Sequence, residues 1–401
     1  MAELVQLRVG RSGPSRTFAL FDLGMRPFFL AAGLTASLSL LWWLLVYAGV
    51  IAPSMQRAAL WHHAHEMCFG FGSAAVAGFL LTATANWTNT RPVQGAPLAL
   101  LFALWLLGRV AFHLQGLHVW LVAVLDCSFL PALAMALWPA LRRGKLKNFT
   151  FEAWILVLAF ANVFYHLEAL GLVAGVTASA LNAGVYSLVM LVVILSGRVV
   201  PGFTQNALRL REKPCETHTH PIVELAAKAV CLGALSSDVI SAPHVLTGLL
   251  ALLAASLLLL RMRYWRSLQV YDQPIVWILH VAHLWVVLGM LLLGLQRVGL
   301  LLLPGVALHA FTAGAVGSMV LAIMTRAALG HTGRPLRATW RIVVAYWLVT
   351  LGAAMRVFGP LFAPSIYRAS ILFGGSAWAL AYVLFTWVYT PILLRPRADG
   401  L

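Results

Sequence analysis

Histidine and glutamate side chains gather within residues 61–72, which read WHHAHEMCFGFG and lead into an apolar run. Neutral imidazole is the commonest protein ligand for iron, copper and zinc. On a helix, side chains three positions apart differ by about 60° in direction, whereas those two apart point about 160° away from each other. His62 with His65, or His63 with Glu66, could therefore face one site. His63 and His65 could share a site only if the helix starts later or is unwound there.

Further histidines lie in other apolar segments of the chain. His280 and His283 are three positions apart, His309 lies in the next apolar segment, and His166 lies far from both. A single histidine in a membrane helix is often a packing or hydrogen-bonding residue, but several groups at one depth favour a shared function. The run CETHTH at 215–220 could bind a metal, although a solvated loop is the simpler interpretation.

The composition indicates that a membrane protein must position these groups. Of 401 residues, 61% are hydrophobic and only 10% are charged, whereas a soluble globular chain carries about 25% charged residues. The mean hydropathy is +0.88. The net charge of +16 comes from basic residues in short loops between apolar runs, which is typical of membrane orientation and not of nucleic-acid binding. The four cysteines lack CxxC spacing, so neither a disulfide framework nor a zinc ribbon is predicted.

A bilayer-spanning helix needs about 20 mostly apolar residues. Twelve segments meet this condition, and their expected ranges are 28–50, 64–85, 97–114, 117–140, 152–173, 181–202, 222–240, 244–262, 273–296, 300–326, 340–360 and 366–391. No cleavable signal peptide is indicated before the first segment. We therefore predict an all-α polytopic membrane protein.

Charge bias orients these helices. With the N-terminus inside, almost all Lys and Arg residues outside the helices fall in inner segments, and the outer segments hold only Arg57, Arg297 and Arg368. Both termini are therefore expected in the cytoplasm. The whole chain, 1–401, is expected to form a single membrane domain. A polar cytoplasmic loop at 203–221 could divide it into halves, 1–202 and 222–401.

The predicted topology converts sequence position into depth, at about 1.5 Å per residue. One polar layer falls in the outer third of the membrane and contains His62, His63, His65, Glu66, Arg109, Asp126, His166, Glu168 and Arg356. Charges inside a membrane are costly and usually face a cavity or a partner, so this layer predicts a polar cavity on the outer side. His283 and His309 are expected deeper, near one plane, on two helices joined by a short turn.

A haem would need histidines from facing helices, small residues for close approach and basic groups for its carboxylates. The segment HAFTAGAVGSMVLAIMTR places Gly314 and Gly317 on one stripe, and the basic candidates are Arg109, Arg198, Arg326 and Arg356. Ordinary close helix packing also explains a stripe of small residues. A proton-coupled transporter would use the same side chains.

Several motifs resemble the NnrS family: RPFFL (26–30), HAHEMCFGF (63–71) with GFLLTATANWT (78–88), GRVVPGFTQN (197–206), and HAFTAGAVGSMVLAIMTRAALGHTGRP (309–335). The resemblance implies a twelve-helix protein of the bacterial inner membrane that contains haem and copper. It also implies a role in the nitric oxide response and in relief of nitrosative stress. The family pattern supports His63, His65, Glu66, His166, Arg198, His280, His309, Arg326, His331 and Arg334. His62 and His283 depart from it, which favours His280 with His309 as a pair.

The expected function is that of a multi-pass membrane protein with haem b, and with copper by resemblance, that binds and removes nitric oxide. The enzyme class considered is an oxidoreductase acting on nitric oxide. The expected partners are the lipid bilayer, nitric oxide and an electron donor such as quinol, without nucleic acid. A proton- or metal-ion-coupled transporter and a bis-histidine electron carrier linked to quinol are the alternatives.

The site residues are assigned by role. The predicted haem ligands are His280 and His309, with His331 and Arg334 as further cofactor contacts. The outer group is predicted to hold a second metal or to relay protons, and it comprises His63, His65, His166 and Glu66. Glu66 is the expected proton donor of a catalytic group that also includes Arg198 and Arg326.

Overall fold

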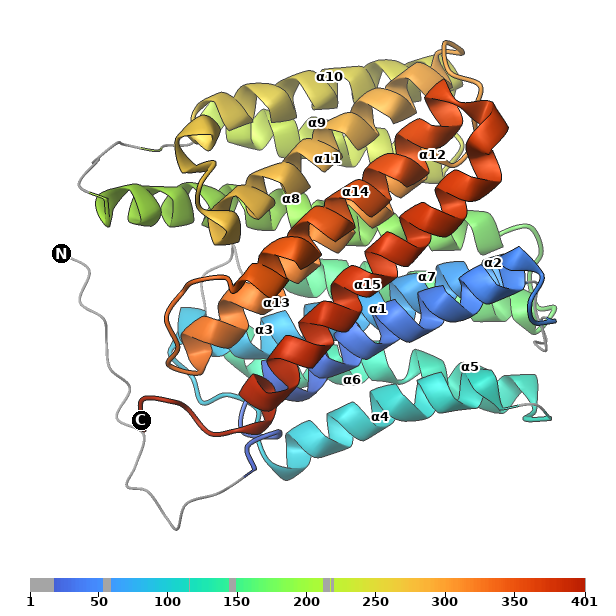
Figure 1. The fold of residues 1–401 in the computed structure, drawn as a ribbon. Helices are drawn as coiled ribbons and strands as arrows, with labels where there is room; N and C mark the ends of the chain where they lie inside the picture. Colours follow the sequence, from blue (N-terminus) through green and yellow to red (C-terminus); the bar gives the residue numbers. More distant parts are fainter. Residues whose placement is uncertain are drawn as a thin grey trace.

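A computed structural model describes residues 18–52, 59–114, 116–143, 149–211, 217 and 220–400. Every regular element in this part of the chain is a helix, and the helices lie side by side in one bundle (Figure 1). Short 3₁₀ segments, η3 (Ser267–Val270) and η5 (Pro364–Ile366), lie in two of the connections. The described chain crosses the bundle in twelve passes: α1 (Met25–Ala48), α2–η1–α3 (Ala59–His65, Glu66–Gly72, Ser73–Thr88), α4 (Ala96–His113), α5–α6 (Val119–Cys127, Phe129–Leu141), α7 (Phe149–Ala169), α8 (Thr177–Arg209), α9 (Pro221–Val239), α10 (His244–Arg263), α11 (Pro274–Arg297), α12–η4–α13 (Val306–His309, Ala310–Val316, Gly317–His331), α14 (Trp340–Phe362) and α15 (Tyr367–Leu394).

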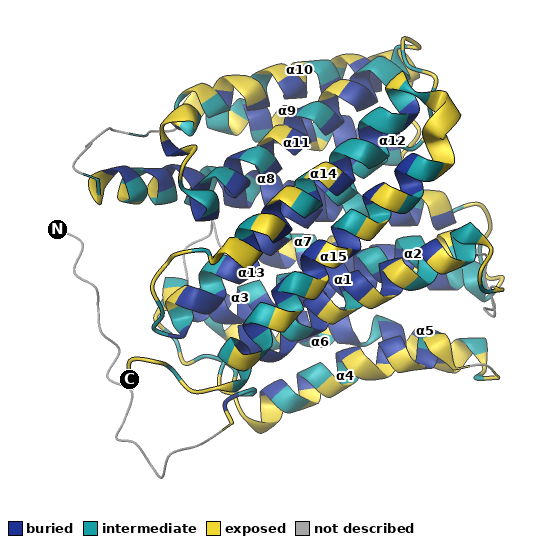
Figure 2. Ribbon diagram, viewed as in Figure 1, coloured by how far each residue is buried: buried dark blue, intermediate teal, exposed yellow. Residues whose placement is uncertain are grey.

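Eleven helices of the described chain are long and apolar enough to cross a membrane. The remaining pass, α9, carries Glu224, Lys228 and Asp238 within its 19 residues, yet it packs between α8 and α10 in the same bundle (Figure 1). The outer faces of α4, α5 and α10 carry exposed apolar side chains such as those of Leu107 and Leu253 (Figure 2). Such faces suit lipid tails, which are as apolar as leucine. The predicted class, an all-α polytopic membrane protein, is confirmed.

The first and last helices meet at one end of the bundle. The backbone N–H of Ala19 donates to the Leu394 carbonyl at 2.9 Å. Arg26 Nη1 donates to the Leu393 and Arg395 carbonyls at 2.7 and 2.6 Å. Because the number of passes is even, the first helix begins and the last helix ends on the same side of the bundle. The cytoplasmic location of this end stays a prediction.

Among the differences from the expected helix boundaries, two affect the interpretation of the site. Helix α8 continues through Pro201 to Arg209, so the first part of the expected loop 203–221 is helical. Cys215, Glu216 and His218 lie outside the described residues. The tenth pass begins at Val306 rather than at position 300, because Gly305 adopts a left-handed φ of 78° that ends the preceding turn. His309 therefore lies in the first helical turn, and the shared plane expected for His283 and His309 is not found.

Four passes form the buried centre of the bundle: α2–η1–α3, α8, α11 and α12–η4–α13. Both η1 and η4 are π-helical, and each contacts α8. Each π segment directly follows a histidine, His65 in one case and His309 in the other. π-helical turns are rare and occur frequently at functional sites. We therefore expect a functional site near these two segments.

Candidate functional site

An apolar cavity of about 1120 Å³, including the open space at its mouth, lies between α1, α2–η1, α8, α12–η4, α14 and α15. Its polar lining consists of His63, His309, Thr312 and Arg356, with the thiol of Cys68. The helices that supply the two imidazoles are far apart in the sequence. The cavity therefore has the form of a ligand site: apolar walls with a few convergent polar groups.

His309 presents a free ring nitrogen to this cavity. Its Nδ1 lies 2.7 Å from the carbonyl oxygen of Gly305. Because a carbonyl only accepts hydrogen bonds, the ring carries its proton on Nδ1, and Nε2 keeps its lone pair. A Cβ placed on Gly305 would lie 3.8 Å from His309 Nδ1 and 4.0 Å from Arg356 Nη2, so the cation lies at the same end of the cavity.

His63 lies on the cavity side of α2 and packs on the ring of Trp43, with a centroid distance of 4.7 Å. His65, two positions later, points away from the cavity and stacks on Phe112 at 4.3 Å. This divergence follows from helical geometry and confirms that His63 and His65 face different sites.

A second cluster lies on the other side of α2. Nitrogen and oxygen atoms of His65, Asp126 and His166 all lie within 4.8 Å of one another, and all three residues are buried. Asp126 Oδ2 lies 3.1 Å from His65 Nε2 and 2.8 Å from His166 Nε2. Asn162 donates to the same oxygen at 2.9 Å, and its own Oδ1 lies 3.0 Å from His65 Nε2.

The ionised side chains of this cluster carry a net negative charge, which a cation could neutralise. Arg109 forms ion pairs with Asp126 Oδ1 and with Glu66 Oε1, the latter at 2.5 Å. His65 Nδ1 lies 3.3 Å from the same Glu66 oxygen. Two carboxylates face one guanidinium, so one negative charge remains for a proton or a metal ion to neutralise. An uncompensated charge buried in a membrane protein is costly, which makes one of these two occupants necessary.

A family model described as NnrS protein matches residues 19–397. The chain belongs to the NnrS family. No curated protein matches the sequence. In this NnrS protein the cavity and the buried cluster both derive from the HAHE motif, because His63 lines one and His65 and Glu66 belong to the other.

The structure does not bring His280 and His309 together. His280 lies near the start of α11, and its ring hydrogen-bonds Thr204 Oγ1 at 2.9 Å and Ser267 Oγ at 2.8 Å. The Thr204 hydroxyl donates to the Val200 carbonyl at 2.9 Å, so it accepts from His280 Nε2. Both ring nitrogens of His280 are therefore used within the protein. The pair favoured by the family resemblance is therefore not found, and His63 and His309 line one cavity instead.

His283 is also occupied by protein groups. Its Nδ1 lies 3.0 Å from Ser196 Oγ, and the ring packs on Trp265 at 4.6 Å. Its departure from the family pattern therefore coincides with a packing and hydrogen-bonding position.

The other predicted site residues lie outside the two sites. Arg198 stacks on Trp87 at 4.5 Å, and Arg326 stacks on Phe203 at 3.8 Å. The backbone of His331 accepts from Arg397 at 3.2 Å, and Arg334 donates to the Thr332 carbonyl at 3.3 Å.

The expected outer polar layer separates into parts with different roles. Glu168 accepts from the backbone of Val176 and Thr177 at 2.7 and 2.6 Å, which fixes the start of α8. His62 is buried between Trp42 and His113, and its ring nitrogens have no hydrogen-bond partner among the described residues. One cluster residue, Asn162, had no place in the sequence prediction, although it lies four positions before His166 on the same face of α7.

Proposed function

We propose that this chain is a haem protein of the bacterial inner membrane that binds nitric oxide and removes it. The observation that carries the proposal is the pair of imidazoles, His63 and His309, that enter one apolar cavity from separate helices. Family membership supports the connection with nitric oxide. A neutral, lipid-soluble gas would reach a site inside the bilayer directly.

The residues of the cavity fit a haem. Cofactor sites are commonly lined by apolar side chains with a few convergent polar groups, and this cavity has such a lining. His309 holds the tautomer that a ligand requires, because Gly305 fixes its proton on Nδ1. Arg356 supplies a positive charge beside His309 for a carboxylate of the cofactor. Haem iron, when bound, supplies a centre for gas binding and electron transfer.

Other protein groups near the cavity could exclude water, hold a proton and bind a second metal. The apolar wall, including Phe71 and Trp378, excludes water from the site. Glu66 Oε1 and His65 Nδ1 can hold a proton between them, and Glu66 directly precedes the cavity residues Met67 and Cys68. His65, Asp126 and His166 together offer two imidazoles and one carboxylate, which suit copper, iron or zinc. Copper is the metal that the family resemblance implies, and quinol is the proposed electron donor.

The test compares cofactor content between variants of the purified full-length chain. We expect wild type to be red with a sharp Soret band that shifts on adding nitric oxide. His63→Ala and His309→Ala should each lose most of the haem, measured by pyridine haemochrome.

His280→Ala is the matched control and should retain haem, because both of its ring nitrogens already bond to Thr204 and Ser267. Full haem in both His63→Ala and His309→Ala would reject the cavity as the haem site. A colourless wild-type preparation would favour a transporter instead. Red protein that does not respond to nitric oxide would favour a bis-histidine carrier.

A further inference from the structure

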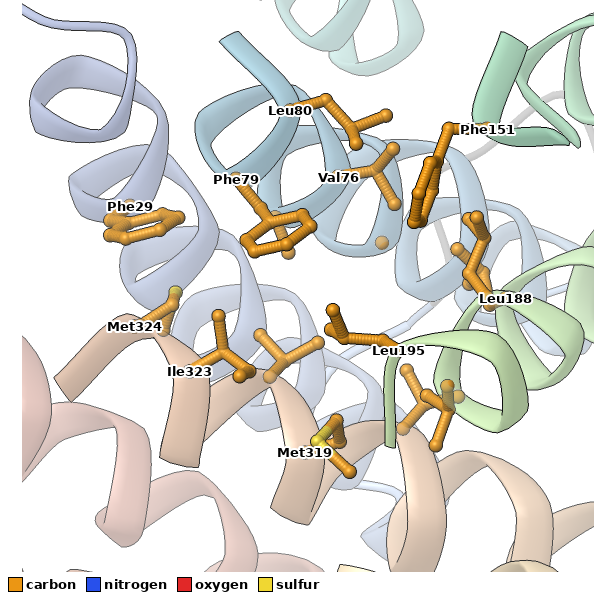
Figure 3. A pocket seen from close by; sticks show the side chains of 16 residues that line it. Phe29, Val76, Phe79, Leu80, Phe151, Leu188, Leu195, Met319, Ile323 and Met324 are labelled. Atoms are coloured by element: carbon orange, nitrogen blue, oxygen red, sulfur yellow. The ribbon is translucent and has the colours of Figure 1, made fainter. Parts of the chain in front are cut away.

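A second cavity lies against the first and is wholly apolar. Its space, including the open space at its mouth, amounts to about 550 Å³, and its side chains come from α1, α3, α7, α8, η4 and α13 (Figure 3). Figure 3 shows Leu188, Leu195, Met319 and Ile323 facing into it from two helices, with Val76 and Phe79 opposite. No lining residue carries a side-chain nitrogen or oxygen atom. We call this space the apolar passage.

The apolar passage and the cavity of His63 and His309 share a wall. Leu188 of α8 and Val316 of η4 line both spaces. Gly72 gives Leu188 its room, because a Cβ on Gly72 would lie only 2.6 Å from Leu188 Cδ1. The two spaces thus meet at two buried aliphatic side chains.

One side of the passage is less buried than the rest. Val76, Phe79 and Val320 are only half-buried, whereas the other lining residues are buried. Val76 lies roughly 26 Å along a pass of about 45 Å, at a rise of about 1.5 Å per residue, so this side lies near mid-membrane. An apolar solute dissolved in the bilayer would meet the protein at this depth.

The apolar lining favours an apolar solute over water as the occupant of the passage. Water in such a space would find none of the polar partners that it needs, and dry apolar cavities bind apolar solutes such as xenon instead. We propose that the apolar passage admits a neutral diatomic gas from the lipid phase to the cavity of His63 and His309, with Leu188 and Val316 as its inner gate. This inference rests on the proposed function for the identity of the gas.

The first test requires no haem. The chain has 11 methionines, and the Met319 and Met324 side chains line the passage, while Met67 lines the first cavity. In protein labelled with ¹³C at methionine methyl groups, xenon pressure should shift the Met319 and Met324 signals and leave Met290 unchanged, because Met290 is buried and lines neither cavity. Leu188→Trp should reduce these shifts. Unchanged Met319 and Met324 signals in wild type would overturn the proposal.

The second test measures access to the haem. After flash photolysis of the carbon monoxide complex, Leu188→Trp and Val316→Phe should slow second-order rebinding by at least about tenfold. Because both residues also line the haem cavity, their rates are compared per bound haem. Leu195→Trp fills the passage outside that cavity and should slow rebinding while haem content and the Soret maximum stay at wild-type values. Leu253→Trp, at an exposed position on α10, is the matched control and should rebind at the wild-type rate.

Different experimental results would reject the haem function and the gas passage. Absence of haem, with the xenon shifts intact, would reject the proposed function and leave a gas-accessible passage. Haem with normal nitric oxide binding, but unchanged rebinding in both gate variants, would reject the passage alone. A lipid or quinone that copurifies in stoichiometric amount and blocks the xenon shifts would overturn the gas proposal in favour of a hydrocarbon tail site.

Discussion

His63 and His65 are one residue apart in the sequence and belong to different sites. The ring of His63 lines the cavity that His309 also lines, and the ring of His65 contacts Asp126 and Asn162. Positions two apart on a helix point in nearly opposite directions, so a single motif can serve both faces of α2. The HAHE sequence therefore couples a cavity to a buried ionic cluster over one helical turn.

At the residue scale, the cluster predicts a bound first-row transition metal. His65→Ala and His166→Ala should each remove it, because each deletes one of three ligand groups. Asn162→Ala should weaken metal binding by about 10- to 100-fold, since Asn162 donates to the ligating oxygen of Asp126 and orients it. Metal content of the purified protein, by plasma mass spectrometry, measures all three.

His118→Ala serves as the control for this prediction, because His118 is exposed and caps the backbone of Trp120. It should leave metal content unchanged. Wild-type protein that contains no metal beyond its haem iron would show that a proton neutralises the cluster instead.

At the element scale, two interrupted helices shape the cavity. The π-helical segments η1 and η4 each contribute three lining residues, and both contact α8. A π-helical turn is wider than an α-helical turn and displaces the side chains that follow. Helix α12 contributes His309 in its first turn only because Gly305 ends the preceding connection.

The close approach of α14 and α15 predicts that a side chain at Gly352 would destabilise the protein. A Cβ on Gly352 would lie 2.5 Å from the Gly374 carbonyl oxygen and 2.9 Å from the backbone N of Trp378. Backbone atoms cannot move aside as a flexible side chain can, so Gly352→Ala should separate the helices and destabilise the protein by about 1–3 kcal/mol. A lower melting temperature in detergent, with reduced haem retention, is the expected result.

Gly202→Ala is the control for the helix contact, because a Cβ at this exposed position of α8 meets nothing within 4 Å. It should melt at or slightly above the wild-type temperature, since alanine favours helix more than glycine does. Equal melting of Gly352→Ala and wild type would contradict the role of the contact.

At the scale of the whole molecule, the buried passes surround α8, and the first and last helices close the bundle beside each other. Helix α1 packs on α15 and on α3, so the first and last helices of the described chain are neighbours. The charge bias of the loops predicts that this end faces the cytoplasm. The connection at 298–305 should then face the opposite side.

Reporter fusions test this orientation. Alkaline phosphatase fused after Gly299 should be active, because it would be exported, and the same enzyme fused at the C-terminus should be inactive. Green fluorescent protein at the C-terminus should fluoresce. The reverse pattern would invert the topology without changing the fold.

The sequence by itself determined the class of the protein and the local directions of its side chains. The length and hydropathy of the apolar runs predict all twelve helical passes, including charged α9, because a membrane requires backbone hydrogen bonds to be satisfied within each segment. The 3.6-residue period also separates His63 from His65 without knowledge of any other helix.

Only the tertiary structure decided which histidines meet. Depth counting placed His283 and His309 near one plane, and the family resemblance then favoured His280 with His309. Thr204 and Ser267 take up both nitrogens of His280. His309 lines a cavity with His63 instead. Sequence position gives depth along the membrane normal, but it does not say which helices are neighbours within the membrane plane. That choice depends on the packing of small and large side chains over many helices at once, and the left-handed turn at Gly305 then sets the depth of His309.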